Sequence, residues 1–150
     1  MRVWIGIDIG AKGGIAVIDS SNTVLKLLDY SEHWADELSL IKAEYDVSMI
    51  VAEKVHSMPG QGVKSVFSFG WKLGELEGIL HTLGLPYILV RPQEWMKGLS
   101  LPKDKTARKK ELASLASSMF PMAEIYGARG GLKDGRSDAL MIASYCKKTY

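Results

Sequence analysis

The sequence contains one cysteine, Cys146, so no disulfide bond can form within the chain, and this residue is expected in the core. It also lacks any apolar run approaching the ~20 residues that span a bilayer. One basic residue followed by a strand pattern at the N-terminus does not resemble a signal peptide. These absences predict a protein of a reducing, cytoplasmic compartment that has no membrane partner.

The chain has 150 residues, of which 47% are hydrophobic and 24% are charged, and this composition predicts one globular domain over residues 1–150. The formal net charge of +2 is unevenly distributed. Residues 1–53 carry 4 basic and 9 acidic side chains, whereas residues 54–150 carry 15 basic and 8 acidic side chains. A basic block that faces an acidic site suits a polyanionic partner that also needs bound metal.

Hydrophobic periodicity predicts an α/β fold. Apolar residues alternate over 3–9, which indicates a strand, and short turns predict antiparallel partners at 13–18 and 23–29. The continuous apolar run at 48–53 is typical of a buried parallel strand, and 85–90 is expected to be a further strand. Helices are expected over 34–45, 65–83, 105–119 and a terminal segment beginning at Asp134 or Ser137, and irregular segments over 56–64 and 91–103, with Trp95 as a core anchor.

Four carboxylates lie where predicted strands end or the last helix begins. Asp8 ends the first apolar run, Glu53 ends another, and Asp134 and Asp138 are four residues apart on one helical face. An ionised carboxylate beside an apolar strand is costly unless it is paired, so their convergence suggests a divalent cation. Oxygen ligands suit Mg²⁺ or Mn²⁺, and two ions ~3.5–4 Å apart could promote phosphodiester cleavage. Gly6 lies on the same strand face as Asp8, where its missing side chain is expected to leave room for a ligand.

Each carboxylate also has a purely structural interpretation. Asp8 could shape the first turn, and Glu53 could pair with Lys54 or Lys12 at the surface. Asp134 could be a helix N-cap, and the aspartate four residues later could be a partner of the helix dipole. The joint arrangement is more specific than any single member, and it favours the two-metal site.

Three segments resemble the RuvC-type Holliday junction resolvases, most closely the short bacteriophage members: Gly-Ile-Asp-Ile-Gly at 6–10, Val-Ala-Glu at 51–53 and Ser-Asp-Ala-Leu-Met-Ile-Ala at 137–143. The resemblance covers nearly the whole chain, with the motifs in family order. It implies a ribonuclease H-like fold, which is a mixed five-stranded sheet with helices on both faces. It also implies a homodimer that makes paired, Mg²⁺-dependent nicks in four-way DNA junctions, located in the host cytoplasm if a phage encodes it.

By this resemblance Asp8, Glu53 and Asp138 match the catalytic acidic positions of the family. In cellular members an acidic or histidine ligand lies three residues before the terminal aspartate. Here that position is Gly135, and Asp134 lies four residues before. Asp134 is therefore predicted as the fourth catalytic and metal-binding residue, with an offset of one residue.

A basic segment at 103–110 and a glycine-containing loop after Glu53 are the predicted DNA contacts. The segment opens a helix and, by the resemblance, contacts phosphates, although it could be only a solvated face. In the loop Met58 could wedge between unstacked bases, and His56 could be a general base or a structural residue. The residues expected to contact DNA are Lys12, Met58, Gln61, Lys103, Lys105, Arg108, Lys109, Lys110, Lys133 and Arg136.

The predicted helix 65–83 carries small residues at regular spacing. It has Gly70, Gly74 and Gly78 at four-residue intervals, beside Phe67 and Trp71. Glycine costs ~1 kcal/mol relative to alanine in a helix, so this stripe indicates close approach either to the sheet or to a twin helix. The family's dimer favours the second interpretation, a homodimer formed through this helix.

Other functions share parts of this pattern. Residues 6–10 also resemble the first phosphate loop of sugar kinases and actin-like ATPases, but the chain has neither their length nor a second phosphate loop. A ribonuclease acting on RNA–DNA hybrids would use the same carboxylates and stays open. A non-catalytic DNA-binding module of the same fold would be expected to lack them.

Overall fold

The computed structural model describes residues 1–54 and 57–150. A five-stranded sheet has the strand order β3-β2-β1-β4-β5. Neighbouring strands β1–β2 and β2–β3 are antiparallel, whereas β1–β4 and β4–β5 are parallel. This confirms the predicted mixed sheet. The strands are β1 (Arg2–Asp8), β2 (Gly14–Asp19), β3 (Val24–Asp29), β4 (Asp46–Glu53) and β5 (Tyr87–Val90).

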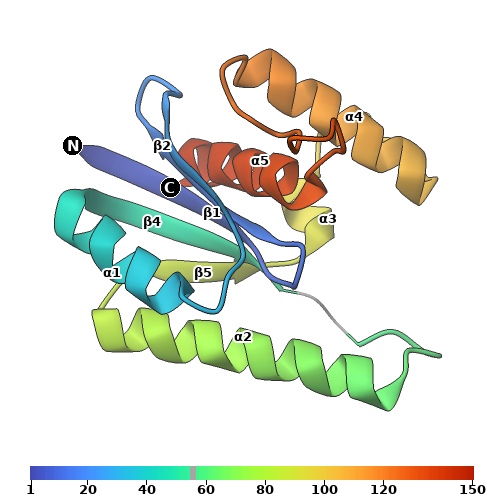
Figure 1. Ribbon diagram of the computed structural model, residues 1–150, viewed down its shortest axis with the longest axis horizontal. Coiled ribbons are helices and arrows are strands. Elements are labelled where there is room, and N and C mark those ends of the chain that lie inside the picture. Colours follow the sequence, from blue (N-terminus) through green and yellow to red (C-terminus); the bar gives the residue numbers. More distant parts are fainter. Residues whose placement is uncertain (55–56) are drawn as a thin grey trace.

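Helices cover both faces of the sheet (Figure 1). On one face, α1 and α2 pack over a core that contains Trp34, Leu38 and Leu76. On the other face, α5 lies against the sheet, and α4 packs on α5. None of the helices in the described ranges is long and apolar enough to cross a membrane. The helices are α1 (Trp34–Glu44), α2 (Val63–Leu83), α3 (Pro92–Trp95), α4 (Lys105–Met119) and α5 (Asp134–Thr149).

The short helix α3 lies within the segment that was expected to be irregular. Pro92 stands at its start, where a fixed φ and a missing N–H are tolerated. The Glu94 carboxylate accepts a hydrogen bond from the Arg91 backbone N–H at 3.0 Å, which closes the first turn. Four residues are too few to produce a detectable hydrophobic period, and this explains why the helix was not predicted.

Side-chain alternation along β1 separates core residues from site residues. Val3, Ile5 and Ile7 are fully buried against α1 and α2. The intervening positions therefore face α5, and these include Gly6 and Asp8. The predicted acidic residue thus points to the side of the sheet that α5 covers.

The space beside Gly6 is filled by α5, so the expectation that it accommodates a ligand was wrong. A Cβ atom at Gly6 would lie 2.2 Å from the Ala139 carbonyl oxygen and 2.3 Å from the Ala143 nitrogen. These are backbone atoms that cannot move aside without displacing the helix. Glycine at this position lets the α5 backbone rest directly on β1, which brings the start of α5 to the end of the strand.

Candidate active site

Three elements bring the four predicted carboxylates to one edge of the sheet. Asp8 is the last residue of β1 and Glu53 the last of β4, and the parallel register places these strand ends side by side. Val51 packs on the α5 side of the sheet, so by alternation Glu53 faces the same side. Asp134 and Asp138 come from the first turns of α5, which crosses this face.

The carboxylates are close enough to influence one another's protonation. Burial raises the pKa of Asp8 to about 9, and the negative charges of the other three carboxylates add to the effect. Burial also raises the pKa of Asp138 to about 7, and the charges of Glu53 and Asp134 add to it. The Oδ1 atom of Asp138 is buried and has no hydrogen-bond partner among the described residues. A buried acceptor without a donor, among repelling carboxylates, calls for a positive partner.

Two of the carboxylates are held by neighbours that sequence reasoning did not assign to them. The Lys109 ammonium, predicted to contact DNA, forms an ion pair with Asp134 Oδ2. The indole Nε1 of Trp95 donates a hydrogen bond to Glu53 Oε2 at 2.7 Å. Trp95 is buried as expected of a core anchor, but its polar edge is turned to the site. Both contacts join residues far apart in sequence, so no local pattern could have revealed them.

The donor set fits a hard divalent cation, although the part of the chain that the structure describes forms no ready-made coordination sphere. Within residues 1–54 and 57–150, no three acidic, histidine or cysteine side chains converge tightly enough to hold a metal ion. The carboxylates are therefore near enough to repel but not near enough to share one point. Oxygen ligands and the buried, unpartnered oxygen of Asp138 suit Mg²⁺ or Mn²⁺, which would draw the ligands together.

The geometry at the start of α5 excludes the N-cap interpretation of Asp134. The N-cap position is Lys133, and the Asp134 backbone carbonyl accepts a hydrogen bond from Ser137 Oγ at 3.0 Å. At the next position, a Cβ atom on Gly135 would lie 2.0 Å from the Lys12 carbonyl oxygen. No side chain fits at Gly135, so a ligand cannot stand there. The close contact between Gly135 and the first turn explains why the acidic residue stands at position 134 and not at position 135.

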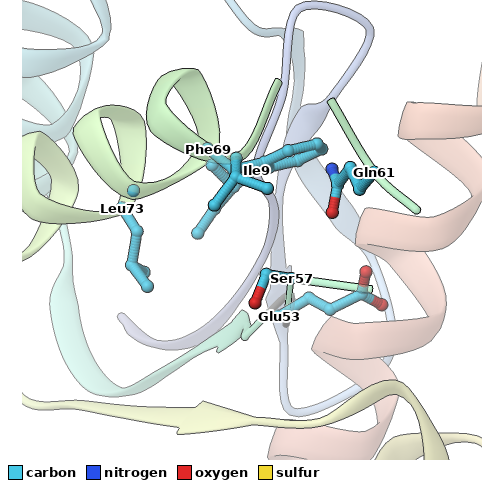
Figure 2. Close-up of a pocket in the computed structure, with 8 residues that line it drawn as sticks. Ile9, Glu53, Ser57, Gln61, Phe69 and Leu73 are labelled. Atoms are coloured by element: carbon cyan, nitrogen blue, oxygen red, sulfur yellow. The ribbon is translucent and has the colours of Figure 1, made fainter. Parts of the chain in front are cut away.

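A cavity of about 180 Å³ lies between Glu53 and α2 (Figure 2). Gln61, a predicted DNA contact, lies at the end of the cavity where Glu53 lies, and Leu73 lies at the opposite side. The Gln61 amide accepts a hydrogen bond from the Met58 backbone N–H at 3.1 Å and donates one to Ser65 Oγ at 3.0 Å. Met58 is exposed, as an intercalating side chain must be. The predicted residue His56 lies outside the described residues.

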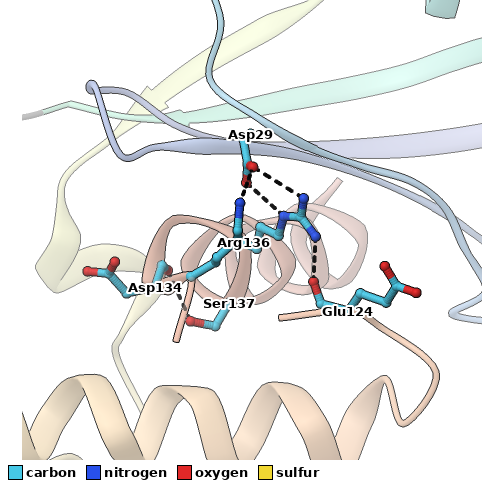
Figure 3. A network of polar contacts seen from close by, with 6 residues as sticks. Asp29, Glu124, Asp134, Arg136 and Ser137 are labelled. Atoms are coloured by element: carbon cyan, nitrogen blue, oxygen red, sulfur yellow. Dashed lines mark hydrogen bonds and ion pairs between the residues drawn. The ribbon is translucent and has the colours of Figure 1, made fainter. Parts of the chain in front are cut away.

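Lys133 and Arg136, also predicted DNA contacts, tie the start of α5 to the end of β3 (Figure 3). Arg136 Nε lies 2.7 Å from Asp29 Oδ1, and its Nη1 donates to the Glu124 carbonyl at 2.7 Å. Lys133 Nζ lies 2.6 Å from Asp29 Oδ2. These partners lower the pKa of Asp29, Arg136 contributing most. In Figure 3 the Asp134 carboxylate points away from this network. Lys133 and Arg136 therefore join α5 to β3 through Asp29, and their contact with DNA stays a prediction.

The predicted basic segment divides into two groups. Lys109 faces the carboxylates, and the Arg108 guanidinium donates to the Lys103 carbonyl at 3.2 Å. The other group consists of exposed lysines at and near the start of α4. Asp104 caps this helix, because its side chain accepts from the Ala107 N–H at 2.8 Å. The exposed lysines are Lys103, Lys105 and Lys110, and Lys12 is likewise exposed in the first turn.

The mixed sheet, its strand order and the helices on both faces define an α/β fold of the ribonuclease H-like class. No protein-family model and no curated protein sequence matches the chain. Solved structures do match. The RuvC of Thermus thermophilus, solved in complex with a Holliday junction substrate, aligns with a TM-score of 0.64 at 18% identity, over 97% of this chain and 92% of that one.

Two further structures have the same architecture. A second structure of Thermus thermophilus RuvC gives a TM-score of 0.60 at 19% identity, over 95% of this chain and 92% of that one. The yeast mitochondrial Holliday junction resolvase Ydc2 gives 0.50 at 17% identity, over 96% of this chain and 77% of that one. At these identities the comparison establishes a shared fold, in agreement with the predicted fold class.

The raised pKa values lead to a test of the acidic cluster in the absence of metal. A carboxyl whose pKa is higher in the folded state stabilises the fold at low pH, and this contribution is lost as the pH rises through the folded value. For Asp8 the loss extends from about pH 4 to about pH 9. Asp8→Asn removes this pH-dependent term, so the melting temperature of the variant minus that of the wild type should grow over this range, by on the order of 10 °C by pH 8.

The measurement is thermal unfolding in a chelator at several pH values, with Asp36→Asn, an exposed aspartate of α1, as the control. The control should show no comparable growth. A difference between Asp8→Asn and wild type that stays constant with pH would contradict the buried, charge-coupled cluster.

Proposed function

We propose that this protein is a metal-dependent endodeoxyribonuclease that resolves four-way and other branched DNA junctions by paired nicks. The observation that carries the proposal is the convergence of Asp8, Glu53 and Asp138 from β1, β4 and α5. The fold supports it, because one matching structure is a RuvC bound to a Holliday junction substrate. The sequence motifs favour the short bacteriophage type of resolvase, acting in the cytoplasm of the host.

The chemistry follows from the donor set. Two bound Mg²⁺ ions, with Mn²⁺ as a substitute, would supply an activated water and stabilise the leaving oxygen of the phosphodiester. Asp8 lies on the central strand β1 and is assigned to both ions, with Glu53 on one, Asp138 on the other and Asp134 assisting. Asp8 and Asp138 bind as carboxylates, so metal binding should release protons and strengthen as the pH rises.

The charge distribution supports a polyanionic substrate. Lys109 lies at the acidic cluster, and the exposed Lys103, Lys105 and Lys110 extend basic surface from it along the start of α4. A phosphate backbone lying on these lysines would pass close to the carboxylates. Such contacts position DNA without reading its sequence.

A homodimer formed through α2 supplies the second nick. Phe67 and Trp71 are 66% and 65% exposed, and their rings meet edge to face with centroids 5.8 Å apart. A Cβ at Gly70, Gly74 or Gly78 would meet nothing within 4 Å, so the stripe does not contact the sheet. An exposed aromatic and small-residue face suits close packing against a second copy of α2. Two-fold symmetry of such a dimer matches the approximate two-fold symmetry of a four-way junction.

The first test is cleavage of a four-way junction, a Y-fork, a linear duplex and an RNA–DNA hybrid, with Mg²⁺, Mn²⁺ or a chelator. The wild type should cut branched DNA only with a divalent cation. Asp8→Asn should abolish cleavage while junction affinity is preserved, because binding depends mainly on phosphate contacts. Cleavage by Asp8→Asn at the wild-type rate would refute the assigned chemistry. Preference for the hybrid would assign the chain as a ribonuclease instead.

A second prediction concerns the DNA-binding surface. Replacing Lys103, Lys105 and Lys110 with glutamine should weaken junction binding and flatten its salt dependence by about 0.9 in log–log slope for each lost phosphate contact. The matched control removes the same charge from Arg2, Lys42 and Lys148, which are exposed at the start of β1 and the ends of α1 and α5. Fluorescence anisotropy at several salt concentrations measures the slopes. Equal slopes for the two triple variants would show that the α4 lysines form only a solvated face.

A third prediction concerns the dimer. Gly74→Arg should yield a folded monomer, because the new side chain enters open space on α2 and arginine favours helix by ~1 kcal/mol over glycine. Sedimentation gives the mass, circular dichroism gives the fold, and paired nicking should be replaced by slow single nicks. Gly131→Arg, at an exposed loop glycine that also has open space, is the control and should remain dimeric. A wild-type protein that stays monomeric at micromolar concentration on junction DNA would refute the dimer.

A further inference from the structure

Glu53 has a buried, neutral hydrogen-bond donor. Trp95 is only 3% exposed, and its Nε1–H donates to Glu53 Oε2 at 2.7 Å. A short bond from an N–H to a carboxylate is among the stronger hydrogen bonds in proteins. The donor occupies one acceptor site of Oε2, so the bond fixes the orientation of the carboxylate and leaves Oε1 fully available to a cation.

The donor is delivered by a rigid segment. Val90, the last residue of β5, pairs with Glu53 in the sheet, and its carbonyl accepts a hydrogen bond from the Lys54 N–H at 2.7 Å. The short helix α3 follows at once, fixed by the hydrogen bond between Glu94 and the Arg91 backbone. Trp95 ends α3 and packs in the core beneath α4 and α5. The distance along the chain from the sheet edge to the indole is therefore short and fully structured.

A neutral donor affects a metal ligand differently from a cation. Lys109 compensates the charge of Asp134, so a divalent cation must compete with it for that carboxylate. The Trp95 indole orients Glu53 but leaves its charge available. Burial raises the pKa of Glu53, and the hydrogen bond from Trp95 opposes that rise. Removing the donor would leave a buried carboxylate free to rotate.

We propose that Trp95 is a positioning residue that holds Glu53 in the orientation required for binding a divalent cation, an inference that rests on the proposed function. It touches neither cation nor DNA and acts through Glu53. Partners that orient metal ligands in this way contribute about 10–100-fold to metal affinity or activity in other proteins.

The chain provides a matched control in a second buried tryptophan. Trp34 is 1% exposed, and its Nε1 donates to Glu75 Oε1 at 3.0 Å. This pair joins α1 to α2 on the opposite face of the sheet. Trp34→Phe and Trp95→Phe therefore remove the same indole N–H and a similar amount of packing, but only the second removes a bond to a predicted ligand.

The experiment compares wild type, Trp95→Phe and Trp34→Phe as full-length proteins. Binding of Mn²⁺ is measured without DNA by calorimetry and by the change in tryptophan emission, and junction cleavage is measured against Mn²⁺ concentration. Trp95→Phe should weaken Mn²⁺ binding by about 10-fold or more. It should also lose the emission change and regain much of the cleavage rate at high Mn²⁺. Trp34→Phe should keep wild-type affinity and the emission change.

The outcomes separate the inference from the proposed function. Equal Mn²⁺ affinity in the two variants, with a wild type that binds Mn²⁺ and cuts junctions, would overturn the role of Trp95 alone. A wild type that neither binds Mn²⁺ nor cuts would overturn the proposed function, and the inference with it. If Trp95→Phe does not fold, a benzothienylalanine at position 95 keeps the ring shape and replaces N–H by sulfur. Unchanged Mn²⁺ affinity in that protein would also overturn the inference.

Discussion

The backbone of α5 rests directly on β1 at Gly6, and the positions of Asp134 and Asp138 relative to Asp8 depend on this contact. The same closeness recurs at the start of the helix, where Gly135 lies against the carbonyl of Lys12. Between these two contacts the helix has no freedom to shift along the strand or away from it. Asp138 is therefore held beside Asp8, and the electrostatic repulsion between them is opposed by core packing on both sides of the helix. A larger residue at either glycine would displace α5 and thereby move Asp138 away from Asp8.

The two strand ends and the helix start are stabilised by different means. Glu53 is oriented by the neutral, buried indole of Trp95. The negative charge of Asp134 is compensated by the ammonium group of Lys109. Asp8 and Asp138 have no such contact within the described residues, and burial together with the neighbouring negative charges raises their pKa values. The cluster therefore combines one carboxylate oriented by a neutral donor, one paired with a lysine and two that are buried beside other negative charges.

Much of the fold followed from the sequence because its signals are local. Period-two alternation in β1 and the continuous apolar run in β4 are strong patterns, and together with short turns they determine the sheet order. The carboxylates could be located for the same reason, since each stands at the end of such a pattern. The details of the site depend on contacts across the fold. Trp95 was expected only as a core anchor, and the space at Gly6 was assigned to a ligand, because nothing near either residue in sequence reports what packs against it.

The ion pairs of Asp29 with Lys133 and Arg136 also depend on residues far apart in sequence, and they join the third strand to the last helix. The carboxylates are likewise contributed by distant parts of the chain, since Asp8 comes from β1 and Asp138 from α5. The sheet without α5 does not bring these two groups together. Their repulsion arises where α5 packs on the sheet, and the apolar side chains that α5 buries there oppose it.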